Sequence, residues 1–303
     1  MKKRDAYAGR MAGDAPGSAV RAAQSVRAAQ SVRARGVLHQ EAAASRFVLA
    51  RREPSAALVP FVAWYWIVRW DLRGQPPHDQ TVLPHPNVHL AFEPAGPVIY
   101  GVLGRELFRR RIEGRGVALG VRFLAGGFRP FWGRPVACLN DRVVPAAQVF
   151  GPPVHETWRA IAGAADDASM VAHAEDLLGR VRPPRDPVAE EVAGMVARIT
   201  ADSSLCRVGE LAGALGLPVR RLQRLFANYV GVSPKWVMRR ARLQEAAMRA
   251  EQGGHVDWAE LAAILDYADQ AHLTRDFTAV IGVPPARYVT VATTASQVSE
   301  PKP

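Results

Sequence analysis

The chain has 303 residues, of which 49% are hydrophobic, and its formal net charge is +11 at pH 7. That length accommodates two domains, and the composition is typical of a globular protein. Two cysteines exclude a zinc site built from cysteine alone and argue against a disulfide framework. No apolar run reaches the ~18 residues of a membrane-spanning helix, and the N-terminus lacks the apolar segment of a secretory signal. We therefore expect a cytoplasmic protein without a membrane partner.

The two ends of the chain are predicted to be disordered. Residues 1–45 form a basic extension with few large apolar side chains, and the sequence RAAQSV occurs twice in it, at 21–26 and 27–32. An extension without function and a basic arm that touches DNA both fit this composition. Residues 291–303 are predicted to be a disordered tail.

Residues 46–181 are predicted to form a β-rich domain, barrel-like or sandwich-like, with a few helices at its end. Its apolar runs are short, rich in β-branched and aromatic residues, and separated by glycine and proline, as in antiparallel sheets. The predicted strands are 60–70, 88–92, 98–103, 117–123 and 136–139, and the predicted helices are 156–162 and 168–178. The three arginines at 109–111 are interpreted as a solvated turn.

Three tryptophans in the first predicted strand are candidates for a binding site. Trp64, Trp66 and Trp70 are two or four residues apart, so their side chains share one face of the strand. This face is either an aromatic part of the core or the wall of a pocket.

A second group in the β-rich region has the chemistry of a metal site. His85, His89 and Glu93 share strand parity, and imidazole and carboxylate groups bind transition metals. Prolines interrupt the segment and no third histidine lies nearby, so the ligand count argues against a metal, and we predict no cofactor. The residues kept as candidates for an effector site are Trp64, Trp66, His85 and His89.

A proline-rich linker is predicted at 182–187, because the three prolines within it cannot continue a helix. Beyond it, 188–290 is predicted to be an all-α DNA-binding domain, which makes the whole chain α+β. Its first helix is expected at 188–199, and Ser203 or Ser204 is expected to cap the next one.

The segment that follows Pro218 has the pattern of a helix with two different faces. Its apolar residues recur at helical spacing, at Leu222, Leu225, Phe226 and Tyr229. Arg220, Gln223 and Arg224 lie about 200° away around the helix. Guanidinium and amide groups make bidentate hydrogen bonds to guanine and adenine in the major groove. The competing interpretation is a solvated face on an ordinary surface helix.

The same pattern occurs a second time, 51 positions later. Leu222, Arg224, Phe226, Gly231, Val232 and Pro234 correspond to Leu273, Arg275, Phe277, Gly282, Val283 and Pro285. Each copy consists of a short helix, a tight turn and a second helix, which is the helix-turn-helix arrangement. The polar face of the second copy carries less charge, so we expect the first copy to dominate base reading.

A long helix is predicted between the two copies, from Pro234 to Gly253, with Ser233 as its N-cap. About 19 residues give a rod of roughly 28 Å, close to the ~34 Å of one DNA turn, so two recognition helices can meet successive major grooves. Residues 218–249 hold eight basic residues and one acidic residue. Lys235, Arg239, Arg240 and Arg242 are expected to contact phosphates or to be solvated.

The C-terminal region resembles the DNA-binding domain of AraC/XylS-type transcription regulators. The resemblance is carried by LAGALGL, LQRLF, VGVSPK, RLQEA, YADQAHLTRDF and IGVPPARY, between residues 205 and 288. It implies seven helices and two helix-turn-helix units that engage two major-groove segments of double-stranded DNA. The base-contacting positions implied are Arg220, Gln223, Arg224, Gln270, Ala271, Thr274 and Arg275. The predicted backbone contacts are Arg221, Lys235, Arg239, Arg242 and His272.

Two positions depart from the pattern of that family. Pro218 stands where a serine N-cap is usual, which should be harmless at a helix start. Asp266 replaces a glycine in the second turn, and we expect it to strain or reshape the second unit. The β-rich region is similar to an N-terminal domain of unknown function found with such regulators, through LPHPNVHLAFE and LGVRFLAGGF. That similarity implies an effector-sensing or dimerising role.

The sequence therefore predicts a sequence-specific transcription regulator without enzymatic activity. Its expected partners are double-stranded DNA, a small-molecule effector, RNA polymerase and a second copy of the chain. The alternative is an enzyme with a DNA-targeting module, either an alkyl-transfer repair protein or a cupin-like metal enzyme that uses His85 and His89. Alkyl transfer needs an activated cysteine, and neither Cys138 nor Cys206 has activating neighbours in sequence.

Overall fold

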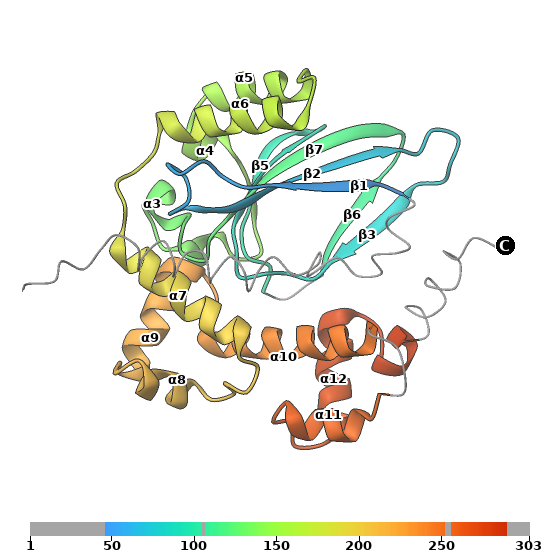
Figure 1. Ribbon diagram of the computed structural model, residues 1–303, viewed down its shortest axis with the longest axis vertical. Helices are drawn as coiled ribbons and strands as arrows, with labels where there is room; N and C mark the ends of the chain where they lie inside the picture. Colours follow the sequence, from blue (N-terminus) through green and yellow to red (C-terminus); the bar gives the residue numbers. More distant parts are fainter. Residues whose placement is uncertain (1–45, 105–106, 252–255, 290–303) are drawn as a thin grey trace, which may run out of the picture.

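The computed structural model describes residues 46–104, 107–251 and 256–289. The predictions for 1–45, for the glycine pair 253–254 and for 291–303 lie outside the described residues. The fold is α+β as predicted, with an N-terminal β-rich part and a C-terminal helical part. Figure 1 shows the sheet between one layer of helices on its upper side and the C-terminal helices below it.

The N-terminal part contains a six-stranded antiparallel sheet and a separate two-stranded ribbon. In sheet order the six strands are β1 (Val48–Arg52), β2 (Val62–Asp71), β7 (Arg115–Phe123), β4 (His89–Glu93), β5 (Gly96–Tyr100) and β8 (Val143–Pro145). The ribbon pairs β3 (His78–Val82) with β6 (Phe108–Ile112). The shorter helical segments are α3 (Arg129–Trp132), the 3-10 helix η1 (Val136–Leu139) and α4 (Ala147–Phe150).

Alternation along the strands gives the sheet two different faces. Tyr65 and Ile67 of β2 and Leu119 of β7 are fully buried in one cluster with side chains of α5 (Pro153–Ala162) and α6 (Asp167–Arg180). Figure 1 shows these two helices lying side by side over that face. The tryptophans of β2 have the opposite parity and therefore face away from α5 and α6.

The helical part contains two helix-turn-helix units on either side of one long helix. Its elements are α7 (Pro187–Ala201), α8 (Val208–Ala214), α9 (Val219–Leu225) with a π-helical continuation η2 (Phe226–Val230), α10 (Pro234–Glu251), α11 (Trp258–Ile264) and α12 (Gln270–Ile281). Figure 1 shows α10 running from the unit of α8 and α9 to the unit of α11 and α12. Ser233 Oγ accepts a hydrogen bond from Trp236 N, so the predicted cap of α10 is confirmed.

Several local predictions are wrong. Residues 109–111 lie in strand β6, where they pair with β3, and do not form a turn. Residues 136–139 form a 3-10 helix because Val136 and Leu139, three positions apart, are both buried. Ser203 and Ser204 do not cap α8, since Arg207 occupies the N-cap and Ser204 bonds to Asp202.

The β-rich part completes both apolar clusters of the helical part. Val102 and Ala125 belong to the cluster that holds Phe226 of the first unit. Leu83 belongs to the cluster that holds Phe277 of the second unit, and Leu107 packs against it. The two parts therefore share their cores.

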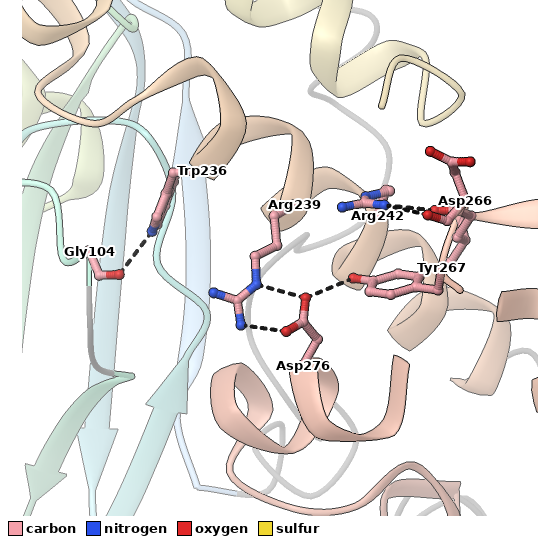
Figure 2. A network of polar contacts seen from close by, with 8 residues as sticks. Gly104, Trp236, Arg239, Arg242, Asp266, Tyr267 and Asp276 are labelled. Atoms are coloured by element: carbon pink, nitrogen blue, oxygen red, sulfur yellow. Dashed lines mark hydrogen bonds and ion pairs between the residues drawn. The ribbon is translucent and has the colours of Figure 1, made fainter. Parts of the chain in front are cut away.

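Polar contacts along α10 and the first unit reinforce this docking. Trp236 Nε1 donates a hydrogen bond of 2.9 Å to Gly104 O, as Figure 2 shows, and Arg240 Nε donates one of 2.6 Å to Pro84 O. Asn140 Nδ2 donates to Gly231 O, at the end of η2. The N-terminal part thus contacts the first unit, the long helix and the second unit.

Candidate DNA-binding surface and effector cavity

The polar face predicted on the first unit lies at the protein surface. Arg220, Gln223 and Arg224 are exposed on α9 and have no hydrogen bond or ion pair with the residues that the structure describes. Leu222 and Phe226, on the opposite face, are fully buried. The helix therefore presents two guanidinium groups and one amide that are available to bind a partner.

The second unit presents a similar but weaker surface on α12. Gln270, Ala271 and Arg275 are exposed, and Thr274 is half-buried. Asp269 caps the helix by accepting a hydrogen bond from His272 N, and the exposed His272 ring packs edge-on against Tyr267. Among Gln270, Ala271, Thr274 and Arg275, only Arg275 carries a charge, as the sequence indicated.

The aspartate in the second turn adopts the backbone conformation that the glycine would adopt. Asp266 has a φ of +54°, and its counterpart in the first unit, Gly216, has a φ of +63°. Aspartate tolerates this left-handed region better than most residues. The turn is therefore preserved, and its cost is limited to the backbone strain at Asp266.

Three arginines of α10 are held by contacts within the protein. Figure 2 shows Arg239 donating two hydrogen bonds of 2.9 Å to the Asp276 carboxylate of α12, with Arg242 directed at the backbone of the second turn. Arg240 is only 4% exposed and faces the β-rich part. The burial of Arg240 corrects the expectation for that residue. Arg239 and Arg242 are partly exposed, so their phosphate contacts stay predictions.

The remaining predicted backbone contacts lie at the surface. Arg221 and Lys235 are exposed, without a hydrogen bond or ion pair to any described residue. Arg239, in contrast, joins α10 to α12 through Asp276, which also accepts a hydrogen bond from the Tyr267 hydroxyl. The structure thus separates the basic residues of this region into a free group and a group that fixes the second unit on the long helix.

A second candidate site is an apolar cavity of about 230 Å³ on the sheet face opposite α5 and α6. Trp64, Trp66 and Trp70 form one wall, so of the two interpretations the pocket wall is correct. Val82, Phe108 and Ile112 of the ribbon also line the cavity. His85 and His89 also line it, which brings the four effector-site candidates to one place.

Two glycines of β7 leave room for the indole rings of Trp66 and Trp70 on this face of the sheet. Trp66 pairs with Gly120 and Trp70 pairs with Gly116 across the two strands. A Cβ atom at either glycine would collide with the indole ring of its partner. The glycines are therefore needed for the shape of this wall.

One end of the cavity carries a buried positive charge. Arg122 is 8% exposed, its guanidinium lies 4.2 Å from the Trp64 ring centroid, and Nη2 donates a 2.7 Å hydrogen bond to Asn87 Oδ1. Its Nε has no partner among the described residues. Burial, and then the charges of Arg51 and Arg240, lower the pKa of Arg122 to about 9, which still leaves it protonated at pH 7.

Glu93 and His89, which also line the cavity, add no unpaired charge to it. The Glu93 carboxylate pairs with Arg110 at 2.6 Å and accepts a hydrogen bond of 2.9 Å from the Tyr100 hydroxyl. His89 Nδ1 accepts a hydrogen bond of 3.1 Å from Trp66 Nε1. Burial, and then the charge of Arg122, lower the pKa of His89 to about 3, so its ring is neutral at pH 7 and its Nε2 carries the proton.

The low pKa of His89 predicts acid-sensitive stability. The unfolded chain takes up this proton near pH 6.5 and the folded chain only near pH 3, so stability falls as the pH drops through that window. Between pH 7 and 5 the wild type should lose about 2 kcal/mol more than His89→Gln. Urea denaturation of both proteins at several pH values measures this, and parallel pH profiles would contradict the assignment.

The enzymatic alternatives need a cluster of metal ligands or an activated cysteine. Among the described residues, no three His, Cys, Asp or Glu side chains cluster as a metal site would require. Cys138 and Cys206 are free thiols, and burial raises the pKa of Cys206, which disfavours the reactive thiolate. This geometry gives no support to either enzymatic alternative.

Comparisons with known proteins agree with this architecture. Residues 50–145 match the domain of unknown function DUF6597, and residues 211–290 match a helix-turn-helix domain family. A comparison with curated proteins finds no match. In its described part, the chain has no helix with the length and apolar character needed to cross a membrane.

Similar solved structures include two of ToxT from Vibrio cholerae. A 1.65 Å structure of ToxT has 10% sequence identity and a TM-score of 0.36, covering 81% of this chain and 98% of that chain. A structure of ToxT bound to an unsaturated fatty acid has 10% identity and a TM-score of 0.36, covering 82% and 93%.

The paired units, the long helix between them and the exposed basic face define a DNA-binding protein with a double helix-turn-helix domain. Its C-terminal part carries a helix-turn-helix domain of the kind found in AraC/XylS-type transcription regulators, and a DUF6597 domain precedes it.

Proposed function

We propose that this protein binds specific DNA sequences by reading two neighbouring major-groove segments, one with each helix-turn-helix unit. The observation that carries the proposal is that α9 and α12, which are related by the internal repeat, both present exposed side chains without partners. Buried aromatic residues hold each helix from the opposite side. Side chains in this state can bind bases without first breaking contacts inside the protein.

We assign the base contacts to Arg220, Gln223 and Arg224 of α9. Arginine and glutamine match the donor and acceptor patterns of guanine and adenine edges. In the second unit the proposed contacts are Gln270, Ala271, Thr274 and Arg275, with a smaller share of the specificity. Arg221, Lys235 and His272 are proposed to contact phosphates, which position the protein but carry no sequence information.

We further propose that a small molecule in the cavity modulates DNA binding. The segment that follows β3 lines the cavity at Leu83, Pro84 and His85, and it also contacts the helical part through Leu83 and through the Pro84 carbonyl. A change in the cavity can thereby reach α10 and the second unit. Contacts with RNA polymerase and with a second copy of the chain stay predictions.

Selection from a random double-stranded DNA library with the full-length protein tests the proposed function. We expect a motif with two conserved segments whose centres lie about 10 base pairs apart, because successive major grooves on one DNA face have that spacing. Affinity for the selected site should exceed that for unrelated DNA by at least about 10³-fold. Equal affinity for all duplexes would refute sequence-specific binding.

A further inference from the structure

Two buried guanidinium groups meet where the β-rich part contacts the helical part. Arg122 comes from β7 and Arg240 from α10, and they are 8% and 4% exposed. Arg122 Nε and Arg240 Nη2 are buried and have no hydrogen-bond partner in the described part of the chain. Their other contacts are with neutral groups, the amide of Asn87, the carbonyl of Pro84 and the amide of Gln244.

A small cavity of about 40 Å³ lies between these two arginines and is lined by both. Residues of α7 and α10 form its other side. Trp64, His85, Asn87 and Arg122 line both this cavity and the larger apolar one. The small cavity thus places two guanidinium groups next to the aromatic wall.

The charges in this region are not balanced within the described protein. Arg51 lies on the same tryptophan, 5.0 Å from the Trp64 ring centroid, and adds a third positive charge. Glu93, the carboxylate that lines the larger cavity, is paired with Arg110. Buried charges in proteins are normally paired, because an unpaired one loses its hydration without compensation. Two buried guanidinium groups without an acidic partner among the described residues favour the binding of an anion.

The lining and the volume of the larger cavity indicate what the uncharged part of the ligand is like. Most of its lining surface is apolar, and its 230 Å³ exceeds the ~150 Å³ of a protein cavity that holds benzene. We propose that the effector is an apolar monocarboxylate, with its body against Trp64 and Trp66 and its carboxylate between Arg122 and Arg240. This inference rests on the proposed function for its regulatory consequence, but not for the binding itself.

A carboxylate in this place would join the two parts of the protein. It would accept hydrogen bonds from β7 through Arg122 and from α10 through Arg240, in addition to the bond between Arg240 and Pro84. Charge-assisted hydrogen bonds are the stronger ones, particularly away from water. The ligand should therefore fix α10, and with it both recognition helices, relative to the sheet.

Isothermal titration calorimetry of the full-length protein without DNA tests the ligand class. The probes are 2-naphthoate and decanoate as apolar carboxylates, 2-naphthalenemethanol as a neutral analogue, and acetate as an anion without an apolar body. We expect at least one of the two apolar carboxylates to bind at least about tenfold more tightly than both controls. Equal binding of 2-naphthalenemethanol, or no binding of either apolar carboxylate, would overturn the proposal.

Substitutions of the two buried arginines test where the carboxylate of the ligand binds. Arg122→Gln and Arg240→Gln should each weaken binding of the carboxylate at least about tenfold. Arg69→Gln is the matched control, because Arg69 lies on the other face of the sheet and pairs with Asp167. Thermal unfolding verifies that each variant is folded, which we expect since the substitution removes an unpaired buried charge. Unchanged affinity in both folded variants would refute the assignment, and the comparison of naphthoate with its alcohol does not depend on them.

DNA binding is measured separately, with and without the carboxylate that binds. We expect the affinity for the selected site to change by at least about fivefold, the lower range of allosteric coupling. If the carboxylate binds but the affinity for DNA stays the same, the proposed regulatory role of the ligand is refuted, and the proposed base contacts are unaffected. If no DNA motif is selected, base reading is wrong while the calorimetric result stands.

Discussion

Replacing Arg224 with alanine should weaken binding to the selected DNA site by about 1–3 kcal/mol and relax the preference at one base pair. The expected loss is specific because Arg224 is exposed and has no partner among the described residues, so its removal leaves the fold intact. Affinity for unrelated DNA should fall much less. Fluorescence anisotropy with the selected duplex, its single-base variants and a scrambled duplex measures all three effects.

Lys235→Ala provides the contrast that this experiment needs. Lys235 is equally exposed at the start of α10, but we assign it to a phosphate. Its removal should weaken binding to all duplexes by a similar factor and reduce the salt dependence by about one charge. If Arg224→Ala behaves in the same way as Lys235→Ala, the base contact is assigned to the wrong residue.

Alanine at Phe226 or at Phe277 should lower the free energy of unfolding by about 3–5 kcal/mol, because each substitution leaves a cavity in a packed cluster. Both rings are fully buried, and they occupy equivalent positions in the two repeats. Phe277 packs edge-on against Trp258 and Tyr288, at centroid distances of 5.9 and 5.5 Å. Chemical denaturation measures the loss in each variant.

Hydrogen exchange distinguishes which unit each substitution affects. Phe226 and Phe277 belong to different clusters, so Phe226→Ala should reduce amide protection mainly in α9 and η2, and Phe277→Ala mainly in α11 and α12. Equal loss of protection in all these helices for both variants would contradict two separate cores and indicate a single cooperative unit.

The helical half was the more predictable because its signals are local. The apolar spacing of Leu222, Leu225, Phe226 and Tyr229 recurs within one helix, and the repeat shows the same pattern again at a distance of 51 residues. Helix periodicity needs no information about what the helix packs against. The same reason explains why the sequence predicts the long helix, its cap at Ser233, and the two helices α5 and α6.

The remaining features depend on contacts between distant segments. Arg239, Arg240 and Arg242 are close together in sequence, but only the docked β-rich part determines that Arg240 is buried. Strand parity placed Trp64, Trp66 and Trp70 on one face, but whether that face borders a cavity depends on the β3–β6 ribbon, which includes the arginines at 109–111. A short run such as 136–139 has no periodicity long enough to separate a strand from a 3-10 turn.

The shared apolar clusters set a limit on recombining this regulator with others. A helical part transplanted onto a foreign sensor would leave Leu83, Val102 and Ala125 behind, and would carry a gap in each of its two units. A functional chimaera would need matching side chains on the new sensor at those three places. In this protein the β-rich part covers the core of the helical part, so exchange of modules is limited by packing as well as by the choice of linker.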